Sequence, residues 1–236
     1  MGRILPDSLR GGLIVSCQAE AGTPLGTPEV LAALAAAAER GGAVGIRANG
    51  PQNLAAIGAS VRVPVIGIYK VVRPPSEVYI TPTFAEARAI HAAARPAIIA
   101  FDATPRPRPD DEDWRTLLRR IQTELGALAM ADISTLEEGV AAAEAGADLV
   151  ATTLSGYTSY TAHKKASGDP DLELVGQLAQ AVSVPVICEG RVHSPEQARA
   201  ALEAGALAVV VGTAITAIDW VTRRYMEAMR TGESHA

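Results

Sequence analysis

The feature that most restricts the fold of this chain is a regular alternation of eight short apolar segments, rich in Val and Ile, with eight longer segments rich in Ala and Leu. The short segments lack the polar alternation of half-exposed strands and are typical of parallel strands buried on both faces. We therefore predict strands at residues 12–18, 43–47, 63–70, 97–102, 127–132, 148–153, 184–190 and 207–212.

The longer segments predict helices at residues 28–40, 51–60, 83–94, 111–124, 134–145, 171–182, 194–204 and 218–230. Three of them begin with residues that cap helix N-termini, either a Thr before Pro or the spacing of a capping box: Thr27-Pro28, Ser134 with Glu137, and Ser194 with Gln197. Three glycines stand where a helix ends and a left-handed residue is expected: Gly41, Gly146 and Gly205.

Eight strands that alternate with eight helices in 236 residues fit a single (β/α)8 TIM barrel domain over residues 1–236, since this α/β fold typically needs about 250 residues. A doubly wound open sheet is the alternative, and both the number of units and the length favour the barrel. The sequence Val-Pro-Val-Ile at 63–66 recurs at 184–187, as expected for a chain built from similar βα units.

Composition argues against several classes of partner. The net charge is −5 and no basic stripe carries interleaved aromatic residues, so nucleic acid is not an expected partner. No apolar run approaches the roughly 20 residues that span a bilayer, and residues 1–12 lack the apolar core of a signal peptide. We expect a soluble cytoplasmic protein with no membrane contact. Cys17 and Cys188 lie in predicted strands, where we expect small buried residues in a reducing compartment.

In a (β/α)8 barrel the reacting groups gather at the carboxyl ends of the strands. Polar residues stand at all eight of these ends, and their shared position predicts one polar cavity. They are Ser16, Gln18, Arg47, Asn49, Lys70, Asp102, Asp132, Thr152, Thr153, Glu189, Arg191 and Thr213. No Cys/His cluster or spacing of three metal ligands is present, so we expect neither metal nor cofactor.

Lys70 is the most informative of these residues. It ends the segment VPVIGIYK, where packing would partly desolvate its amine and favour the neutral form that removes protons or forms imines. Glu189 stands at nearly the equivalent place in the segment that repeats Val-Pro-Val-Ile. A Lys and a Glu that face each other across a barrel mouth could move a proton on a carbon next to a carbonyl.

An anion site is predicted after the seventh and eighth strands, where barrels of this kind often bind phosphate through backbone N–H groups. Gly190 and Gly212 would let the backbone approach the anion closely, and residues 213–216 could form a short helix. The long segment 156–170 after the sixth strand is either a lid over the site or a solvated loop, with Lys164 and Lys165 in water.

The chain resembles the N-acetylmannosamine-6-phosphate 2-epimerase (N-acylglucosamine-6-phosphate 2-epimerase) family. The matching segments run in order from residue 11 to 216 and occupy nearly every predicted strand end. They are GGLIVSCQA, GGAVGIRANG, IGIYK, SEVYITPT, AFDATPRPRP, MADISTLEEG, TTLSGYT, CEGRVHSPEQA and VVVGTAIT.

This resemblance implies an enzyme of sialic acid and amino-sugar catabolism. It would interconvert N-acetylmannosamine 6-phosphate and N-acetylglucosamine 6-phosphate without a cofactor, as a homodimer. By the resemblance, Lys70 exchanges the proton at C2, and Glu189 polarises the carbonyl end or assists ring opening. The sugar and its N-acetyl group would contact Gln18, Arg47 and Asp132. The phosphate would contact Gly190, Arg191, Gly212 and Thr213.

The sequence departs from the family pattern after the eighth strand, where Ala217-Ile218 stand in place of the usual Arg-Pro. An expected cationic contact is therefore missing near the predicted phosphate site.

Two other functions stay open at this point. One is a Schiff-base aldolase in which Lys70 attacks a carbonyl, and the other is a non-catalytic sensor of a sugar phosphate.

Overall fold

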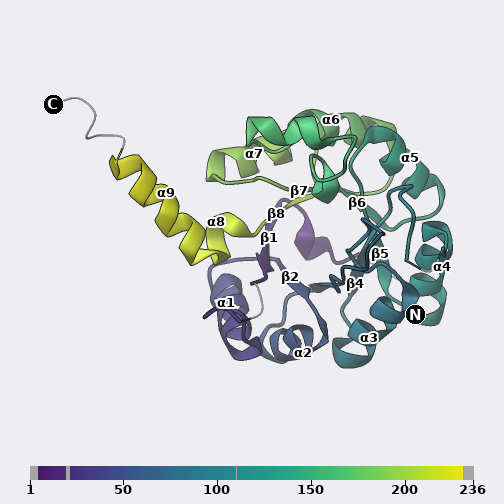
Figure 1. Ribbon diagram of the computed structural model, residues 1–236, viewed down its shortest axis with the longest axis horizontal. Coiled ribbons are helices and arrows are strands. Elements are labelled where there is room, and N and C mark those ends of the chain that lie inside the picture. Colours follow the sequence, from purple (N-terminus) through teal and green to yellow (C-terminus); the bar gives the residue numbers. More distant parts are fainter. Residues whose placement is uncertain (1–4, 20–21, 110, 231–236) are drawn as a thin grey trace.

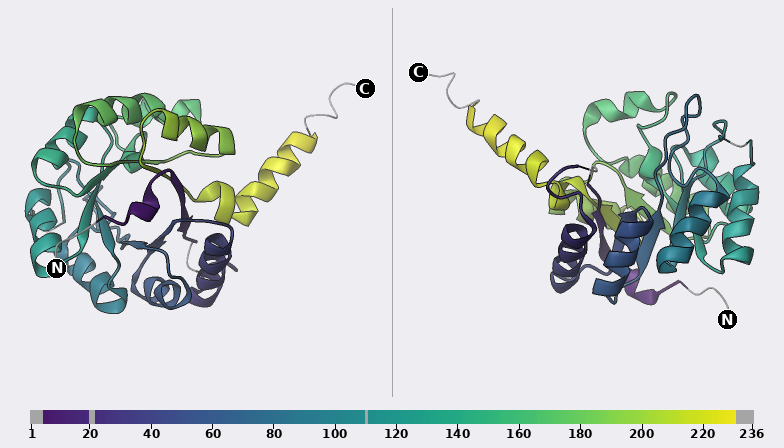
Figure 2. Two further views of the ribbon diagram at one scale, coloured as in Figure 1. Left: turned by 180° about the vertical axis from the view of Figure 1, so that it is seen from behind. Right: turned by 60° about the horizontal axis from the view of Figure 1, so that its bottom comes forward.

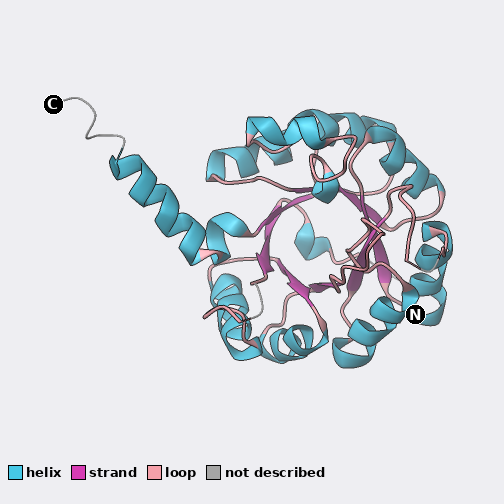
Figure 3. Cartoon of the chain, viewed as in Figure 1, coloured by secondary structure: helices cyan, strands magenta, loops and turns pink. Residues whose placement is uncertain are grey.

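The computed structural model describes residues 5–19, 22–109 and 111–230, and within them eight parallel strands form a closed barrel in sequence order (Figure 1, Figure 3). The strands are β1 (Gly12–Cys17), β2 (Gly45–Asn49), β3 (Val65–Ile68), β4 (Ile98–Asp102), β5 (Leu128–Asp132), β6 (Leu149–Ala151), β7 (Val186–Glu189) and β8 (Ala208–Val211). Pairing of β1 with β8, which begins with Gly12 opposite Ala208, closes the sheet. The predicted barrel is confirmed, and the open sheet is excluded.

Helices follow the strands and surround the barrel (Figure 1). They are α1 (Pro28–Arg40), α2 (Pro51–Ser60), α3 (Phe84–Ala94), α4 (Trp114–Glu124), α5 (Leu136–Glu144), α6 (Leu172–Ala181), α7 (Pro195–Glu203), α8 (Thr213–Thr216) and α9 (Ile218–Arg230). Short 3-10 helices lie at η1 (Asp7–Leu9), η2 (Thr152–Leu154) and η3 (Ala162–Ser167). The eight predicted helices are present, and α8 forms at the predicted residues 213–216.

Burial of both strand faces explains the lack of polar alternation. In β1, Ile14 packs inside the barrel and its neighbour Val15 packs outward against the helices, and both are at most 2% exposed. Leu9 of η1 belongs to the interior cluster and is fully buried, so η1 closes the amino end of the barrel (Figure 2). The polar cavity can therefore open only at the carboxyl ends of the strands.

The helix signals are confirmed in part. Thr27 and Ser194 cap α1 and α7, but Gln197 accepts from the backbone N–H of His193, one residue before the cap. The capping box of α5 uses Thr135 and Glu138 rather than Ser134 and Glu137. Ser134 instead donates its hydroxyl to Glu138, at 2.8 Å. A one-residue shift of this kind arises because two neighbouring hydroxyl residues are both able to cap.

The glycine signals also hold in part. Gly146 and Gly205 have the left-handed conformation, with φ of 93° and 108°. Gly41 does not, because its φ is −75° and the left-handed residue is Gly42, with φ of 99°. A helix followed by two glycines gives no local signal that decides which of them turns the chain.

The last helix departs from the expected arrangement. α9 forms over the predicted residues but points away from the barrel, and none of its described residues is buried (Figure 1, Figure 2). It therefore does not cover β8 as the eighth helix of a barrel normally would. No helix in the described part of the chain is long and apolar enough to span a membrane.

Candidate active site

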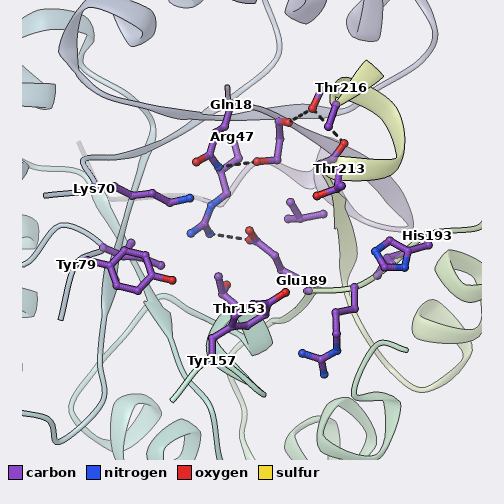
Figure 4. Close-up of a pocket in the computed structure, with 18 residues that line it drawn as sticks. Gln18, Arg47, Lys70, Tyr79, Thr153, Tyr157, Glu189, His193, Thr213 and Thr216 are labelled. Carbon is purple, nitrogen blue, oxygen red and sulfur yellow. Dashed lines mark hydrogen bonds and ion pairs between the residues drawn. The ribbon is translucent and has the colours of Figure 1, made fainter. Parts of the chain in front are cut away.

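A cavity of about 300 Å³ lies at the carboxyl ends of the strands, the size of a small-molecule site (Figure 4). Of the nine residues predicted for the site, the structure brings eight to its wall. They are Gln18, Arg47, Lys70, Glu189, Gly190, Arg191, Gly212 and Thr213. The ninth, Asp132, lies behind the wall, and its side chain is fully buried. These eight residues come from the ends of five strands or the loops that follow them, namely β1, β2, β3, β7 and β8.

A buried ionic network forms the floor of the cavity. Arg47, at 1% exposure, donates to both carboxylate oxygens of Asp132, at 3.1 and 2.6 Å. Its guanidinium also pairs with Glu189 at 2.8 Å (Figure 4). Thr153 donates a further hydrogen bond to Asp132 at 2.7 Å. One permanent cation therefore holds two carboxylates, and Asp132 is positioned to orient Arg47 rather than to contact a ligand.

Glu189 ends β7, and only 14% of its side chain is exposed. Its backbone is fixed by Thr152, whose hydroxyl donates to the Glu189 carbonyl at 3.0 Å and accepts from its N–H at 3.1 Å. Burial raises the pKa of Glu189, the positive charge of Arg47 opposes that rise, and the negative charge of Asp132 adds to it. A carboxyl whose pKa is raised toward neutrality can both give and take a proton.

Lys70 lies two residues beyond β3 rather than within it, in an antiparallel bridge with Ile80. Its backbone N–H donates to the side chain of Asn49, at the end of β2, at 2.7 Å. Lys70 reaches into the open cavity, yet protein surrounds its amine closely enough that burial lowers the pKa (Figure 4). The charge of Arg47 lowers the pKa further, so a neutral amine is more accessible here than on a free lysine.

The loops after β7 and β8 border the opposite side of the cavity. Gly190 has φ of 112°, and a Cβ on Gly212 would lie 3.1 Å from the Cβ of Ser16. Thr216 donates its hydroxyl to the Ser16 carbonyl at 2.9 Å, which ties α8 to β1. Ala217 also lines the cavity, so the position that departs from the family pattern lies in the wall of the site.

Arg191 lines the cavity, but its guanidinium is directed to the segment after β6. The side chain donates to the carbonyls of Ser155 and Asp169, the latter at 2.7 Å. Gly156 permits this approach, because a Cβ there would lie 2.6 Å from the guanidinium. Arg191 therefore links the loop after β7 to residues 155–169, a contact that we call the latch. Its guanidinium is directed to these carbonyls rather than to a position where it could bind an anion.

The segment 156–170 is tied down rather than freely solvated. Asp171 accepts from Ser155 at 2.6 Å and from Lys164 at 2.9 Å, so Lys164 is not simply directed to water. Tyr160 donates to the buried carboxylate of Glu138. Tyr157 consequently sits at the mouth of the cavity, 41% exposed. The segment covers one side of the site as a fixed wall.

Two further residues that line the cavity, Tyr79 and Tyr157, were not predicted from the sequence. They lie inside loops, nine residues beyond the predicted strand end at Lys70 and four beyond the one at Thr153, so the rule of strand ends does not select them. Conversely, Asp102 ends β4 but does not line this cavity. It is fully buried and accepts hydrogen bonds from Thr104 at 2.7 Å and Arg106 at 2.6 Å.

Cys17 and Cys188 are buried and free, as expected. Burial raises the pKa of Cys17 to about 11 and that of Cys188 to about 12, so both remain thiols. Among the residues that the structure describes, no three His, Cys, Asp or Glu side chains come together as a group that could hold a metal ion.

Comparisons with known proteins show the family to which the chain belongs. Residues 31–231 match the family model described as "Putative N-acetylmannosamine-6-phosphate epimerase". A relative from Synechococcus elongatus is 52% identical over 222 residues, covers 94% of each chain and is named "Putative N-acetylmannosamine-6-phosphate 2-epimerase". A relative of the same name from Thermosynechococcus vestitus is 50% identical over 226 residues and covers 96% of each chain.

Two solved structures illustrate the range of structural likeness. The N-acetylmannosamine-6-phosphate 2-epimerase from Clostridium perfringens superposes with a TM-score of 0.89 at 44% identity, covering 94% of this chain and 95% of its own. A thiamine phosphate pyrophosphorylase from Pyrococcus furiosus has a TM-score of 0.59 at 17% identity, covering 95% of each chain. The second likeness shows the fold alone.

The hydrogen bonds of Arg191 predict how mutation changes the protease sensitivity of the segment 156–170. Arg191→Gln should speed trypsin cleavage after Lys164 and Lys165 by about tenfold or more, because hydrogen bonds to a charged group contribute about 1.5–3 kcal/mol each. Gly156→Ala should act in the same direction, since its Cβ would displace the guanidinium. The measurement is the native-state cleavage rate, followed by mass spectrometry.

Gly176→Ala in α6 is the matched control for that experiment, because its Cβ would meet the Ala204 carbonyl at an ordinary 3.7 Å. It should leave the cleavage rate unchanged. An Arg191→Gln rate equal to that of the unmodified protein would show that the guanidinium does not hold the segment.

Proposed function

Because the chain belongs to the N-acetylmannosamine-6-phosphate epimerase family, we propose that it interconverts N-acetylmannosamine 6-phosphate and N-acetylglucosamine 6-phosphate by proton transfer at C2. The observation that carries the proposal is the pairing of Lys70, whose pKa is lowered, with Glu189, whose pKa is raised, in one cavity. The lowered pKa of Lys70 favours its neutral, basic form, and the pKa of Glu189, raised to about 7, keeps an acidic proton available near neutral pH.

The chemistry requires an open chain before the proton can leave. The C2–H bond is acidic only when C1 is an aldehyde, so the ring must open first. Glu189 is suited to this step, since a carboxyl titrating near neutrality can take the proton of the C1 hydroxyl and give one to the ring oxygen. Neutral Lys70 then removes the C2 proton, and the electron pair moves through C1 to its oxygen, which becomes an enolate. Return of the proton to the other face of C2 gives the epimer.

Binding of the sugar is assigned to the remaining polar groups. The Oε1 atom of Gln18 is buried without a hydrogen-bond partner among the described residues, while its Nε2 donates to Ser16 at 2.7 Å. An unpaired buried acceptor is costly, and the N–H of an N-acetyl group would satisfy it. We assign the phosphate to the backbone around Gly190, Gly212 and Thr213, where the loops after β7 and β8 border the cavity.

In this assignment Arg191 supports the phosphate side from behind, through its latch, and Asp132 orients Arg47. The Schiff-base aldolase and the non-catalytic sensor are not favoured, because the relatives reported above are named as epimerases.

The proposed place of the enzyme is in sialic acid and amino-sugar catabolism in the cytoplasm, the compartment in which phosphorylated sugars are formed and consumed. The proposed reaction needs no metal or organic cofactor.

We also propose that the chain acts as a homodimer, and α9 supports this. Four of its apolar residues fall on one face at helical spacing and are exposed: Ile218, Tyr225, Met226 and Met229 are 56%, 70%, 44% and 69% exposed. A second copy is a suitable occupant, because each chain presents the same exposed apolar face on a helix that points away from its own barrel (Figure 1). Two identical chains would each cover the apolar surface of the other.

The dimer proposal predicts that Tyr225→Glu combined with Met229→Glu halves the solution mass while the barrel stays folded. Size-exclusion chromatography with light scattering measures the mass, and circular dichroism checks the fold. Glu227→Lys, on the opposite side of α9, is the control and should remain dimeric. A monomeric unmodified protein, or a doubly substituted protein that still dimerises, would contradict the proposal.

The catalytic proposal predicts that Lys70→Ala lowers kcat for epimerisation by about 10²- to 10⁴-fold or more, because a positioned acid–base group contributes about that factor. Proton NMR in D₂O should show deuterium entering C2 with the unmodified protein and a matching loss of exchange in the variant. Lys165→Ala is the comparison, because Lys165 is an exposed lysine beside Tyr157 at the edge of the cavity. Epimerisation without deuterium at C2 would argue against proton transfer with solvent exchange.

The charges around Lys70 predict a pH dependence. Activity should rise with pH as the amine loses its proton, with a midpoint below the ordinary lysine pKa. The carboxylate of Glu189 raises the pKa of Lys70, so Glu189→Gln should move that rising limb to lower pH, even though the overall rate falls. The measurement is kcat/KM against pH. Gln18→Ala changes no charge and should leave the midpoint in place, and a midpoint that rises in Glu189→Gln would refute this assignment.

A further inference from the structure

Tyr79 is a cavity-lining residue that the proposed reaction leaves without a task. It belongs to the segment that returns from Lys70 toward α3. Val71 donates its backbone N–H to the Tyr79 carbonyl at 2.9 Å, and Lys70 bridges Ile80. Thr81 donates to the Tyr69 carbonyl at 2.9 Å and extends this pairing. The backbone thus holds the phenol and the amine of Lys70 on the same wall of the cavity.

The hydroxyl of Tyr79 is directed into the cavity, below Lys70 and toward Thr153 and Glu189 (Figure 4). Within the part of the chain that the structure describes, no backbone or side-chain acceptor takes a hydrogen bond from it. Burial raises the pKa of Tyr79, and the negative charges of Asp102 and Asp132 raise it further. The group is therefore a neutral phenol that keeps its proton and has that proton available for a ligand.

The two arginines of the wall are already engaged by other groups of the protein. Arg47 is engaged by Asp132 and Glu189, and Arg191 by two backbone carbonyls. Lys70 becomes positively charged only after it has taken the proton. Glu189 is an acceptor when ionised and would repel a developing negative charge. The enolate oxygen formed on removal of the C2 proton still needs a donor, and stabilising such charge is commonly the largest part of catalysis.

We propose that the Tyr79 hydroxyl is a catalytic hydrogen-bond donor to the C1 oxygen of the open-chain N-acylhexosamine phosphate, where it stabilises the enolate. This inference rests on the proposed function. In the step, the C2–H bond breaks, its proton forms an N–H bond on Lys70, and its electron pair forms the C1–C2 double bond. The carbonyl π pair moves to the C1 oxygen. Tyr79 keeps its own proton and shares it through the hydrogen bond, so no other reactant is required.

Tyr79→Phe tests the proposal, because it removes one oxygen atom and keeps the ring. We expect kcat to fall by about 10²- to 10³-fold, as for removal of one oxyanion donor, with little change in KM. Exchange of C2 hydrogen with D₂O should fall by the same factor, since both directions pass through the enolate. Tyr69→Phe is the matched control, because Tyr69 lies on the same segment but packs against the core outside the cavity. It should retain the unmodified rates.

Equal thermal melting of Tyr79→Phe and the unmodified protein would separate chemistry from folding. A Tyr79→Phe variant with unchanged kcat, or one in which only KM rises, would overturn the assignment of an enolate donor. The unmodified protein is assayed first. If it neither epimerises the substrate nor exchanges the C2 hydrogen, the proposed function itself is refuted and this inference with it. If it turns over and Tyr79→Phe turns over equally, the proposed function stands and this inference alone is refuted.

Discussion

The site depends on the charge of Arg47, buried at the centre of the barrel mouth. An isolated guanidinium in that position would be strongly destabilising, and two carboxylates compensate it. Asp132 does so with two parallel hydrogen bonds at 3.1 and 2.6 Å, and Glu189 with a single ion pair at 2.8 Å. The asymmetry matters, because the doubly bonded carboxylate serves as an anchor while the other keeps an edge toward the cavity.

The same charge acts in one direction on both proposed catalytic groups, since it lowers the pKa of each. Arg47 lowers the pKa of Lys70, which favours a neutral base, and opposes the rise that burial imposes on the pKa of Glu189. Removing Arg47 would therefore affect both partners at once. The three residues come from β2, the loop after β3, and β7, so only closure of the barrel brings them together. The pKa shifts of Lys70 and Glu189 consequently depend on closure of the barrel.

Hydrogen bonds from neighbouring side chains hold the backbone around the cavity in place. Thr152 fixes the backbone of Glu189, Asn49 fixes that of Lys70, and the latch of Arg191 fixes the wall that carries Tyr157. In each case a short polar side chain or an arginine satisfies backbone groups at a strand end or in a loop. Such support holds the proposed site residues in position, both at strand ends and in the loops that follow them.

The sequence by itself determined the alternation of strands and helices, and with it the barrel, because burial of both strand faces leaves continuous apolar runs and helix ends need caps and glycines. It also placed eight of nine candidate residues at the cavity, since strand ends in a parallel barrel converge. Only the tertiary structure decided that Asp132 faces Arg47 rather than the cavity, that Arg191 turns to Ser155 and Asp169, and that α9 leaves the barrel. These outcomes depend on the direction of long side chains and on packing between distant segments, and local patterns of residue type carry neither.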